Sequence, residues 1–402
     1  MKKILSIMLT LVLIFSLAAC GGSDQSGGDT TAENAEKSKE SGDSSSEDGT
    51  VEITYATWSM ETEMQEMVDL YNASQNQVHV TLQVTPLSEY GTLMNEVLGT
   101  EEGPDVLWAG LQTRLWGNAG RLAELQDKVT EDQMDLSVFM EYPLKQNYVG
   151  DTLYGIPCYT DSYAICYNKA IFDKYGVEYP KEGWNWNDYE ALAEELNSKI
   201  KAEGGNEFAS ALAINEPAHG TLLLLTCNGA KLYNEDVTAC ALNVPESVEM
   251  LEMVQRMVES GAQADYDTLV ETNAASLFLS GLAGMIIICP DPGANGLFEG
   301  TSVKETLDYI AFPNGPTSGT NYIDTVTMNN IVINSGTTKF DAAWDFVKWY
   351  TTNQEALDAY AKIEWHLPTN VNAFDAWEAS HDYAEVYVEE ADKVVTVWDV
   401  PL

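Results

Sequence analysis

The sequence is poor in positive charge. It holds 20 Lys and Arg residues against 63 Asp and Glu residues, which gives a formal net charge of −43 at pH 7. So acidic a chain repels nucleic acid and anionic lipid head groups, and we expect neither as a partner. The mean charge does not determine the ligand, because one pocket can differ from the surface around it.

The sequence also lacks motifs for catalysis. It contains no GxSxG, no HExxH and no phosphate-binding GxxxxGK[ST] sequence. The four histidines are scattered, at His79, His219, His366 and His381, and no His and carboxylate cluster has the spacing of a metal site. We therefore expect no enzyme activity, no cofactor and no metal.

Cysteine is rare, and the spacing of the cysteines does not indicate disulfide bonds. Cys20 stands apart near the N-terminus, and the other five have no CxxC pair: Cys158, Cys166, Cys227, Cys240 and Cys289. An odd number without paired spacing indicates neither a disulfide framework nor a zinc site. Most lie in apolar runs and are predicted to be small buried hydrophobic residues. A single bridge, for instance between Cys227 and Cys240, stays open.

The N-terminus has the pattern of a secretory signal peptide. Lys2 and Lys3 precede an apolar run, Ile4 to Leu17, which is shorter than the about 20 residues that span a bilayer. The run ends in Leu17-Ala18-Ala19-Cys20, which resembles the bacterial lipobox. That resemblance implies removal of residues 1–19, a lipid on Cys20, and attachment to the outer face of the cell membrane through this lipid alone. An ordinary signal peptide with an incidental cysteine is the alternative.

The segment after Cys20 predicts a tether. Residues 21–50 contain Gly, Ser, Asp, Glu, Thr, Asn, Gln, Lys and Ala and no larger apolar residue, so they cannot bury enough apolar surface to fold. We assign residues 20–50 to a lipidated, acidic, disordered linker.

More than 380 residues remain after the signal peptide. This length exceeds what one ordinary hydrophobic core accommodates and favours two domains.

Hydrophobic periodicity predicts an α/β fold. Strands at 51–56, 78–84 and 105–108 alternate with helices at 61–72 and 90–98, the order of a parallel sheet flanked by helices. In such sheets ligands bind beyond the carboxyl ends of the strands, here Trp58-Ser59 and Trp108 to Gln112. Further along, Asn187 is a plausible N-cap of a helix at 189–200, with Glu190 completing a capping box.

Several motifs together resemble a known family. They are Gly103-Pro104-Asp105-Val106, Tyr154 to Pro157 through Ile165 to Lys169, Trp184 to Tyr189, Phe278 through Gly281 to Met285, and Ala342 to Val347. In this order they resemble extracellular solute-binding proteins of ABC importers, in the carbohydrate-type, maltose-binding-protein-like group. The resemblance implies a monomer that captures a saccharide and delivers it to the permease subunits of an ABC transporter.

The resemblance also implies an architecture. It predicts two lobes, each a mostly parallel sheet flanked by helices, with the ligand in a cleft between them. The N-terminal lobe is expected to comprise 51–160 and 326–363, and the C-terminal lobe 161–325 and 364–402. The chain is expected to cross between the lobes near 159–164, near 323–326 and near Trp365.

Candidate ligand contacts follow from these positions and from sugar chemistry. A sugar needs flat aromatic faces and polar side chains that bind its hydroxyls. The implied contacts are Trp58, Ser59, Trp108, Gln112, Tyr159, Asp161, Glu216, His219, Asp291, Asp324 and Trp365. Two positions depart from the family: Ala218 replaces an aromatic residue, and Asp291-Pro292 stands where relatives carry a stacking Trp. Trp184 and Trp186 are expected in the core, and Tyr383 to Glu390 on a solvated helix face.

A different ligand class stays open. Asp161, Asp291 and Asp324 could together hold a cationic solute such as a polyamine, because converging carboxylates demand a positive charge. A third interpretation is that the chain is an adhesive or purely structural lipoprotein.

Overall fold

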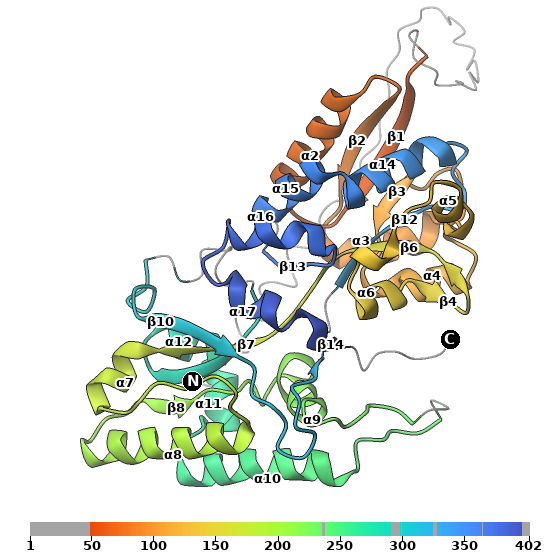
Figure 1. Cartoon of the computed structure of the whole chain (residues 1–402). Helices are drawn as coiled ribbons and strands as arrows, with labels where there is room; N and C mark the ends of the chain where they lie inside the picture. Colours follow the sequence, from red (N-terminus) through yellow and green to blue (C-terminus); the bar gives the residue numbers. More distant parts are fainter. Residues whose placement is uncertain are drawn as a thin grey trace, which may run out of the picture. The chain divides into compact units, whose positions relative to one another are not determined.

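The computed structural model describes residues 49–234, 238–290, 298, 300–324, 328–363 and 365–395. For Ala218, His219, Asp324 and Met328 it describes the backbone alone. The signal peptide, Cys20, nearly all of the tether and Asp291 lie outside the described residues. Two larger sheets organise the described chain, each with helices packed against it (Figure 1).

The first sheet has six strands in the order β13-β6-β12-β3-β1-β2. Their bounds are β1 Val51–Thr57, β2 Val78–Val84, β3 Val106–Trp108, β6 Gly155–Thr160, β12 Met328–Ile333 and β13 Leu367–Pro368. β1 pairs in parallel with β2 and β3, whereas β12 pairs antiparallel with β3 and β6, and β13 antiparallel with β6. The carboxyl ends of β1, β3 and β6 and the amino ends of β12 and β13 therefore meet at one edge.

Helices cover this sheet, and α2 (Glu61–Ser74) does so with the residues that its sequence spacing predicts. α2 turns Met64, Met67, Val68 and Tyr71 inward and packs against β2. α14 (Phe340–Thr352) contacts β1, β6 and β12, and α15 (Gln354–Ile363) packs on α2 and α14. α3 (Leu87–Val97) buries Tyr90 and Met94 in a smaller cluster with Trp116.

The second sheet has four strands in the order β10-β7-β9-β8. These are β7 Ala164–Asn168, β8 Phe208–Ser210, β9 Ala283–Ile288 and β10 Leu307–Ala311. β7 lies antiparallel to both β9 and β10, and β8 pairs in parallel with β9. α7 (Lys169–Tyr175) packs on β9 and β10, α8 (Trp186–Ala202) on β8, and α10 (Pro245–Ser260) on α8 (Figure 1).

Shorter elements lie between these strands and helices and after β13. They are η1 Gly110–Gln112, α4 Thr113–Asn118, α5 Gln126–Glu131, η2 Leu136–Val138, α6 Glu141–Lys145, β4 Tyr148–Val149, β5 Thr152–Leu153, η3 Pro217–Leu222, α9 Leu223–Thr226, α11 Tyr266–Glu271, α12 Ala274–Leu279, β11 Ile323–Asp324, η4 Val371–Ala373, α16 Phe374–Glu378, α17 Ala384–Glu389, η5 Ala391–Lys393 and β14 Val394–Val395. β11 and β14 pair in parallel, which ties the C-terminal part of the described chain back to the segment before β12.

The strand directions add a detail to the expected fold. Most strands of each sheet run in one direction, as expected: β1, β2, β3 and β6 in the first sheet, and β8, β9 and β10 in the second. β12, β13 and β7 run against them, so both sheets are mixed. Parallel neighbours need a long crossover, usually a helix, and the first three strands have one. β12 and β13 instead enter the first sheet from the C-terminal half and run the other way. The predicted division into lobes stays a prediction, and β13 falls on the other side of its 363/364 boundary.

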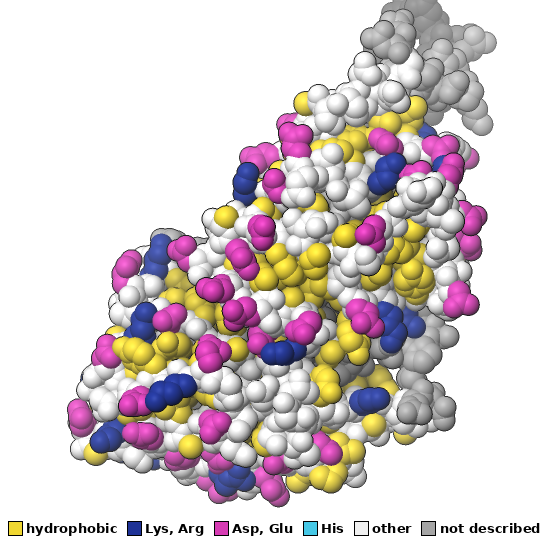
Figure 2. Space-filling view, viewed as in Figure 1, with side chains coloured by type: hydrophobic (Ala, Val, Ile, Leu, Met, Phe, Trp, Pro, Cys, Tyr) yellow, Lys and Arg dark blue, Asp and Glu magenta, His cyan; other side chains and the backbone are white. Residues whose placement is uncertain are grey.

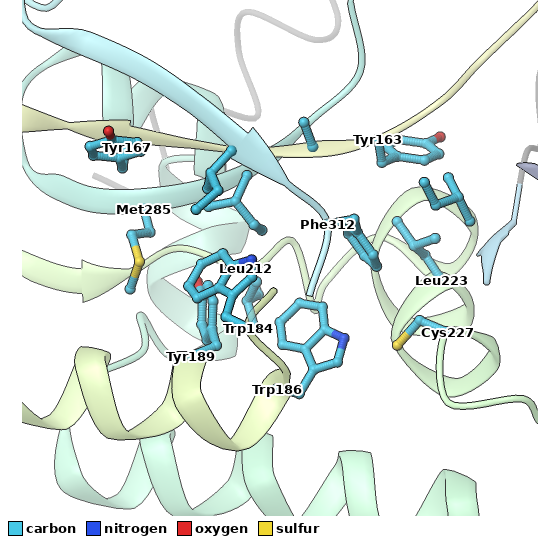
Figure 3. Close-up of a cluster of buried hydrophobic side chains, with 14 of the residues drawn as sticks. Tyr163, Tyr167, Trp184, Trp186, Tyr189, Leu212, Leu223, Cys227, Met285 and Phe312 are labelled. Atoms are coloured by element: carbon cyan, nitrogen blue, oxygen red, sulfur yellow. The ribbon is translucent and has the colours of Figure 1, made fainter. Parts of the chain in front are cut away.

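Aromatic residues fill the core beside the second sheet. Trp186 is fully buried and lies 4.9 Å from Tyr189 and 5.3 Å from Phe312 between ring centroids (Figure 3). Trp184 is also buried, and its indole N–H donates to the Ala311 carbonyl at 2.8 Å. The prediction that both tryptophans are core residues is confirmed.

Two local expectations are wrong. The N-cap of α8 is Asn185, not Asn187, because the Asn185 side chain accepts from the Asn187 and Asp188 amides, and the Asp188 side chain completes the capping box. The Tyr383 to Glu390 segment is not a solvated face, since Tyr383, Tyr387 and Glu390 are buried. The Tyr387 hydroxyl donates to the Ile288 carbonyl at 3.1 Å, so this helix covers the second sheet.

The surface is strongly acidic. Figure 2 shows acidic side chains spread over the visible face with fewer basic ones between them. Cys227 and Cys240 are free thiols, so the Cys227–Cys240 bridge is not formed; Cys158, Cys166 and Cys227 are buried, and Cys240 is exposed. Across the ranges given above, no helix combines the length and the apolar character that crossing a membrane requires.

Candidate functional site

A row of aromatic rings lies at the edge of the first sheet where strand ends meet. Trp58 follows β1, Trp108 ends β3, Tyr159 lies near the end of β6, and Trp365 and His366 precede β13. The ring centroids of Trp58 and Trp108 lie 5.0 Å apart, and those of Trp108 and Tyr159 6.1 Å. Tyr159 stacks on His366 at 4.1 Å and 8°, and His366 on Trp365 at 3.4 Å. The sheet thus brings together rings that are about 300 residues apart in the sequence.

The rings of this row differ in accessibility. Trp108 has no exposed surface and Tyr159 is 4% exposed, whereas Trp58 and Trp365 are partly exposed. Ser59 and Gln112, which follow β1 and β3, are exposed. Trp58 and Trp365 are therefore the aromatic faces that a solute can reach in this conformation, and Trp108 and Tyr159 support them from behind.

Hydrogen bonds fix the strand ends beneath the row. The Tyr90 hydroxyl donates to the carbonyls of Trp108 at 2.7 Å and Ala56 at 3.2 Å. Burial raises the pKa of Tyr90 well above its usual value, although the bond to Trp108 lowers it, so the hydroxyl remains a donor. Tyr90 also places its ring 5.2 Å from that of Trp58. Tyr90, on α3, thereby holds the Trp58 ring in place.

Asp161 lies next to this row. Its Oδ1 is 3.3 Å from Nε2 of His366, and both side chains are buried. The carboxylate follows β6, at the start of the path to β7, and the imidazole precedes β13. Asp161 is thus engaged with His366 in this conformation, and does not stand as an isolated charge.

Several buried polar atoms at this edge have no protein partner in the described chain. They are Nε1 of Trp108, both amide atoms of Asn329, and Oγ of Ser162. Asn329 stands opposite Tyr159 at an irregularity in the β12–β6 ladder. Such groups are costly to leave unsatisfied, by about 1–3 kcal/mol each. Asn329 and Ser162 were missed in the sequence; the signal that could have found them is their position beside the expected crossings near 323–326 and 159–164.

The remaining predicted contacts are not assembled with the row. Glu216 precedes η3 and is partly exposed, and its carbonyl accepts from the Gly220 and Thr221 amides. Gly220 approaches the Ala213 carbonyl so closely that a Cβ would lie 1.8 Å from it, so this turn requires glycine. No hydrogen bond, ion pair or ring contact between described residues joins Glu216 to the row. The His219 and Asp324 side chains and all of Asp291 and Cys20 lie outside the described structure.

Among the described residues of this edge, no nucleophile is hydrogen-bonded to an activating base. An Asp–His pair could orient a nucleophile, but the nearby Ser162 hydroxyl makes no hydrogen bond to His366. A nucleophile and its base need to be within hydrogen-bond reach. Within the described ranges, no group of three or more His, Cys, Asp or Glu side chains is placed to hold a metal ion.

Comparison with known proteins gives a family match over most of the chain. The family described as bacterial extracellular solute-binding protein matches residues 57–357. A putative binding protein of Brucella abortus is 25% identical over 359 residues, covering 87% of this chain and 81% of that protein. The maltotriose-binding protein of Pyrococcus abyssi is 25% identical over 289 residues, covering 70% of this chain and 58% of that protein.

Solved structures share the fold. An ABC substrate-binding protein from Listeria monocytogenes, solved in complex with cycloalternan, superposes with a TM-score of 0.68. It is 23% identical, and the match covers 86% of this chain and 88% of that one. At this identity the likeness establishes the two-domain α/β fold.

Proposed function

Because the chain belongs to the family of bacterial extracellular solute-binding proteins, we propose that it captures a carbohydrate outside the cell and delivers it to the permease of an ABC importer. The observation that carries the sugar class is the aromatic row at the sheet edge. Its accessible members, Trp58 and Trp365, are suited to the apolar C–H faces of sugar rings. The polar Ser59 and Gln112 beside them are suited to hydroxyls.

The polar chemistry favours a neutral polyhydroxylated solute over an amine. The exposed Ser59 hydroxyl and Gln112 amide each offer both a donor and an acceptor. A protonated polyamine has only donors and could pair with the acceptors alone, whereas a sugar hydroxyl both donates and accepts. Asp161 is already engaged by His366. The named ligands of relatives, maltotriose for the Pyrococcus protein and cycloalternan for the Listeria protein, support the same class.

The proposal includes the membrane anchor, the oligomeric state and the lobe architecture of the protein. A monomer is anchored to the outer face of the cell membrane by a lipid on Cys20, and it binds its solute between two lobes without chemistry on it. The lobes follow the predicted ranges, with β13 assigned to the first. Replacing Cys20 by Ser should abolish incorporation of radiolabelled palmitate and release the protein into the medium; continued labelling would refute the anchor.

The ligand class is tested by titration calorimetry on the chain from residue 21 onward. Mono- and oligosaccharides, amines and divalent metals are compared. We expect saccharide binding, weakened about two- to tenfold in Trp365→Ala, because an aromatic contact contributes about 0.5–1.5 kcal/mol. Trp349→Ala is the matched control, since Trp349 is a partly buried tryptophan that stacks on Phe346 in α14. Binding of amines and no saccharide would refute the sugar class.

A further inference from the structure

The Asp161–His366 pair joins two segments that are distant in sequence. Asp161 follows β6 on the path from the first sheet to the second, and His366 lies on the path from α15 into β13. Oδ1 and Nε2 are 3.3 Å apart, and the side chains of Asp161 and His366 are 4% and 8% exposed. The imidazole is further held by Tyr159, whose ring stacks on it at 4.1 Å and 8°. Movement of either segment relative to the other must alter this contact.

The strength of this contact depends on protonation. An imidazolium 3.3 Å from the carboxylate is attracted to it by opposite charge, and a neutral imidazole lacks this attraction. Burial excludes much of the solvent that would screen the charges. Histidine is the side chain that ordinarily gains or loses its charge between pH 5 and pH 8, so the ionic attraction within the pair depends on pH in this range.

The elements packed against β13 carry other titratable groups. β13 contacts β6, α16 and α17. From β6 the titratable neighbours are Cys158 and Tyr159, and from the segment after β6 the neighbour is Tyr163, two residues after Asp161. The acids of α16 and α17 are exposed: Asp375, Glu378, Glu385 and Glu389. Lys362, near the end of α15, is also exposed.

We propose that the Asp161–His366 pair makes solute binding depend on pH, with tighter binding when His366 is protonated. The ionic pair fastens the two connecting segments and so stabilises the arrangement in which Tyr159, His366 and Trp365 stand together. As pH rises through the titration of His366, this stabilisation is lost, and both fold stability and solute affinity fall. The affinity part rests on the proposed function; the stability part does not.

The test measures two quantities at pH 5.5 and pH 8, on the chain from residue 21 onward. One is the urea midpoint without solute, and the other is the Kd of the saccharide found by calorimetry. The variants are His366→Gln and, as a second way to remove the pair, Asp161→Asn. His79→Gln is the control, since His79 is exposed on β2. These variants separate the pair from other titrating groups.

For the wild type and His79→Gln we expect Kd to rise about three- to tenfold from pH 5.5 to pH 8, and the urea midpoint to fall. Both variants of the pair should lose most of this pH dependence. Equal pH dependence in wild type and His366→Gln, or a flat wild type, would overturn the proposal. If no saccharide binds at either pH, the proposed function fails, and the urea midpoints still decide whether the pair responds to pH.

Discussion

Glu207 offers a quantitative test of the electrostatics beside the second sheet. It precedes β8, and its carboxylate accepts hydrogen bonds from Lys174 Nζ at 2.5 Å and from the Tyr175 hydroxyl at 2.8 Å. Burial raises the pKa of Glu207, but these bonds lower it more, to about 2. Since a glutamate in the unfolded chain titrates near pH 4.3, the ionised form stabilises the fold at pH 7. That stabilisation is fully present above about pH 4.3 and is lost as the pH falls toward 2.

The expected size follows from the shift and the exposure. Lowering the pKa of Glu207 from about 4.3 to about 2 corresponds to about 3 kcal/mol, and because Lys174 is 52% exposed, we discount this to about 1–2 kcal/mol. Glu207→Gln should therefore lower the free energy of unfolding by about 1–2 kcal/mol at pH 7, and the difference should shrink between pH 5 and pH 2. Urea unfolding followed by tryptophan fluorescence measures it, with exposed Glu203→Gln as control. A difference that stays constant from pH 7 to pH 3 would refute the charge-based reasoning.

Three further outcomes check the fold. Asn185→Ala should destabilise α8 by about 1 kcal/mol and Asn187→Ala by a few tenths, because Asn185 holds the cap; urea midpoints that reverse this order would contradict the capping geometry. Trp186→Ala should cost about 3–5 kcal/mol by the same measurement, and a loss below 1 kcal/mol would be incompatible with its burial. Iodoacetamide should alkylate Cys240 in the native protein and reach Cys227 only after unfolding, since burial raises the pKa of the Cys227 thiol; peptide mass spectrometry reads this out, and native labelling of Cys227 would disprove it.

The family and the α/β fold could be predicted from the sequence, and both predictions are confirmed. The elements were predictable where periodicity was strong. Val78–Val84 forms the expected strand, and α2 turns inward the four apolar residues that its spacing selects. The α8 cap was less predictable, because Asn185 and Asn187 are both good N-cap residues two positions apart. Burial of Trp186 at the start of the helix, a tertiary effect, fixes the cap at Asn185.

The sequence by itself determined which segments are strands and helices, where the core tryptophans lie, and which strand ends carry aromatic and polar residues. These properties are local, because they follow from the period of burial and the chemistry of one segment. Only the tertiary structure decided that β12 and β13 join the first sheet antiparallel, since strand pairing depends on contacts between residues more than 150 positions apart. The same long-range packing buries Trp108 beside Trp58 and brings His366 into contact with Asp161. The partners of a side chain across a sheet are fixed by strand register and not by its neighbours in the chain.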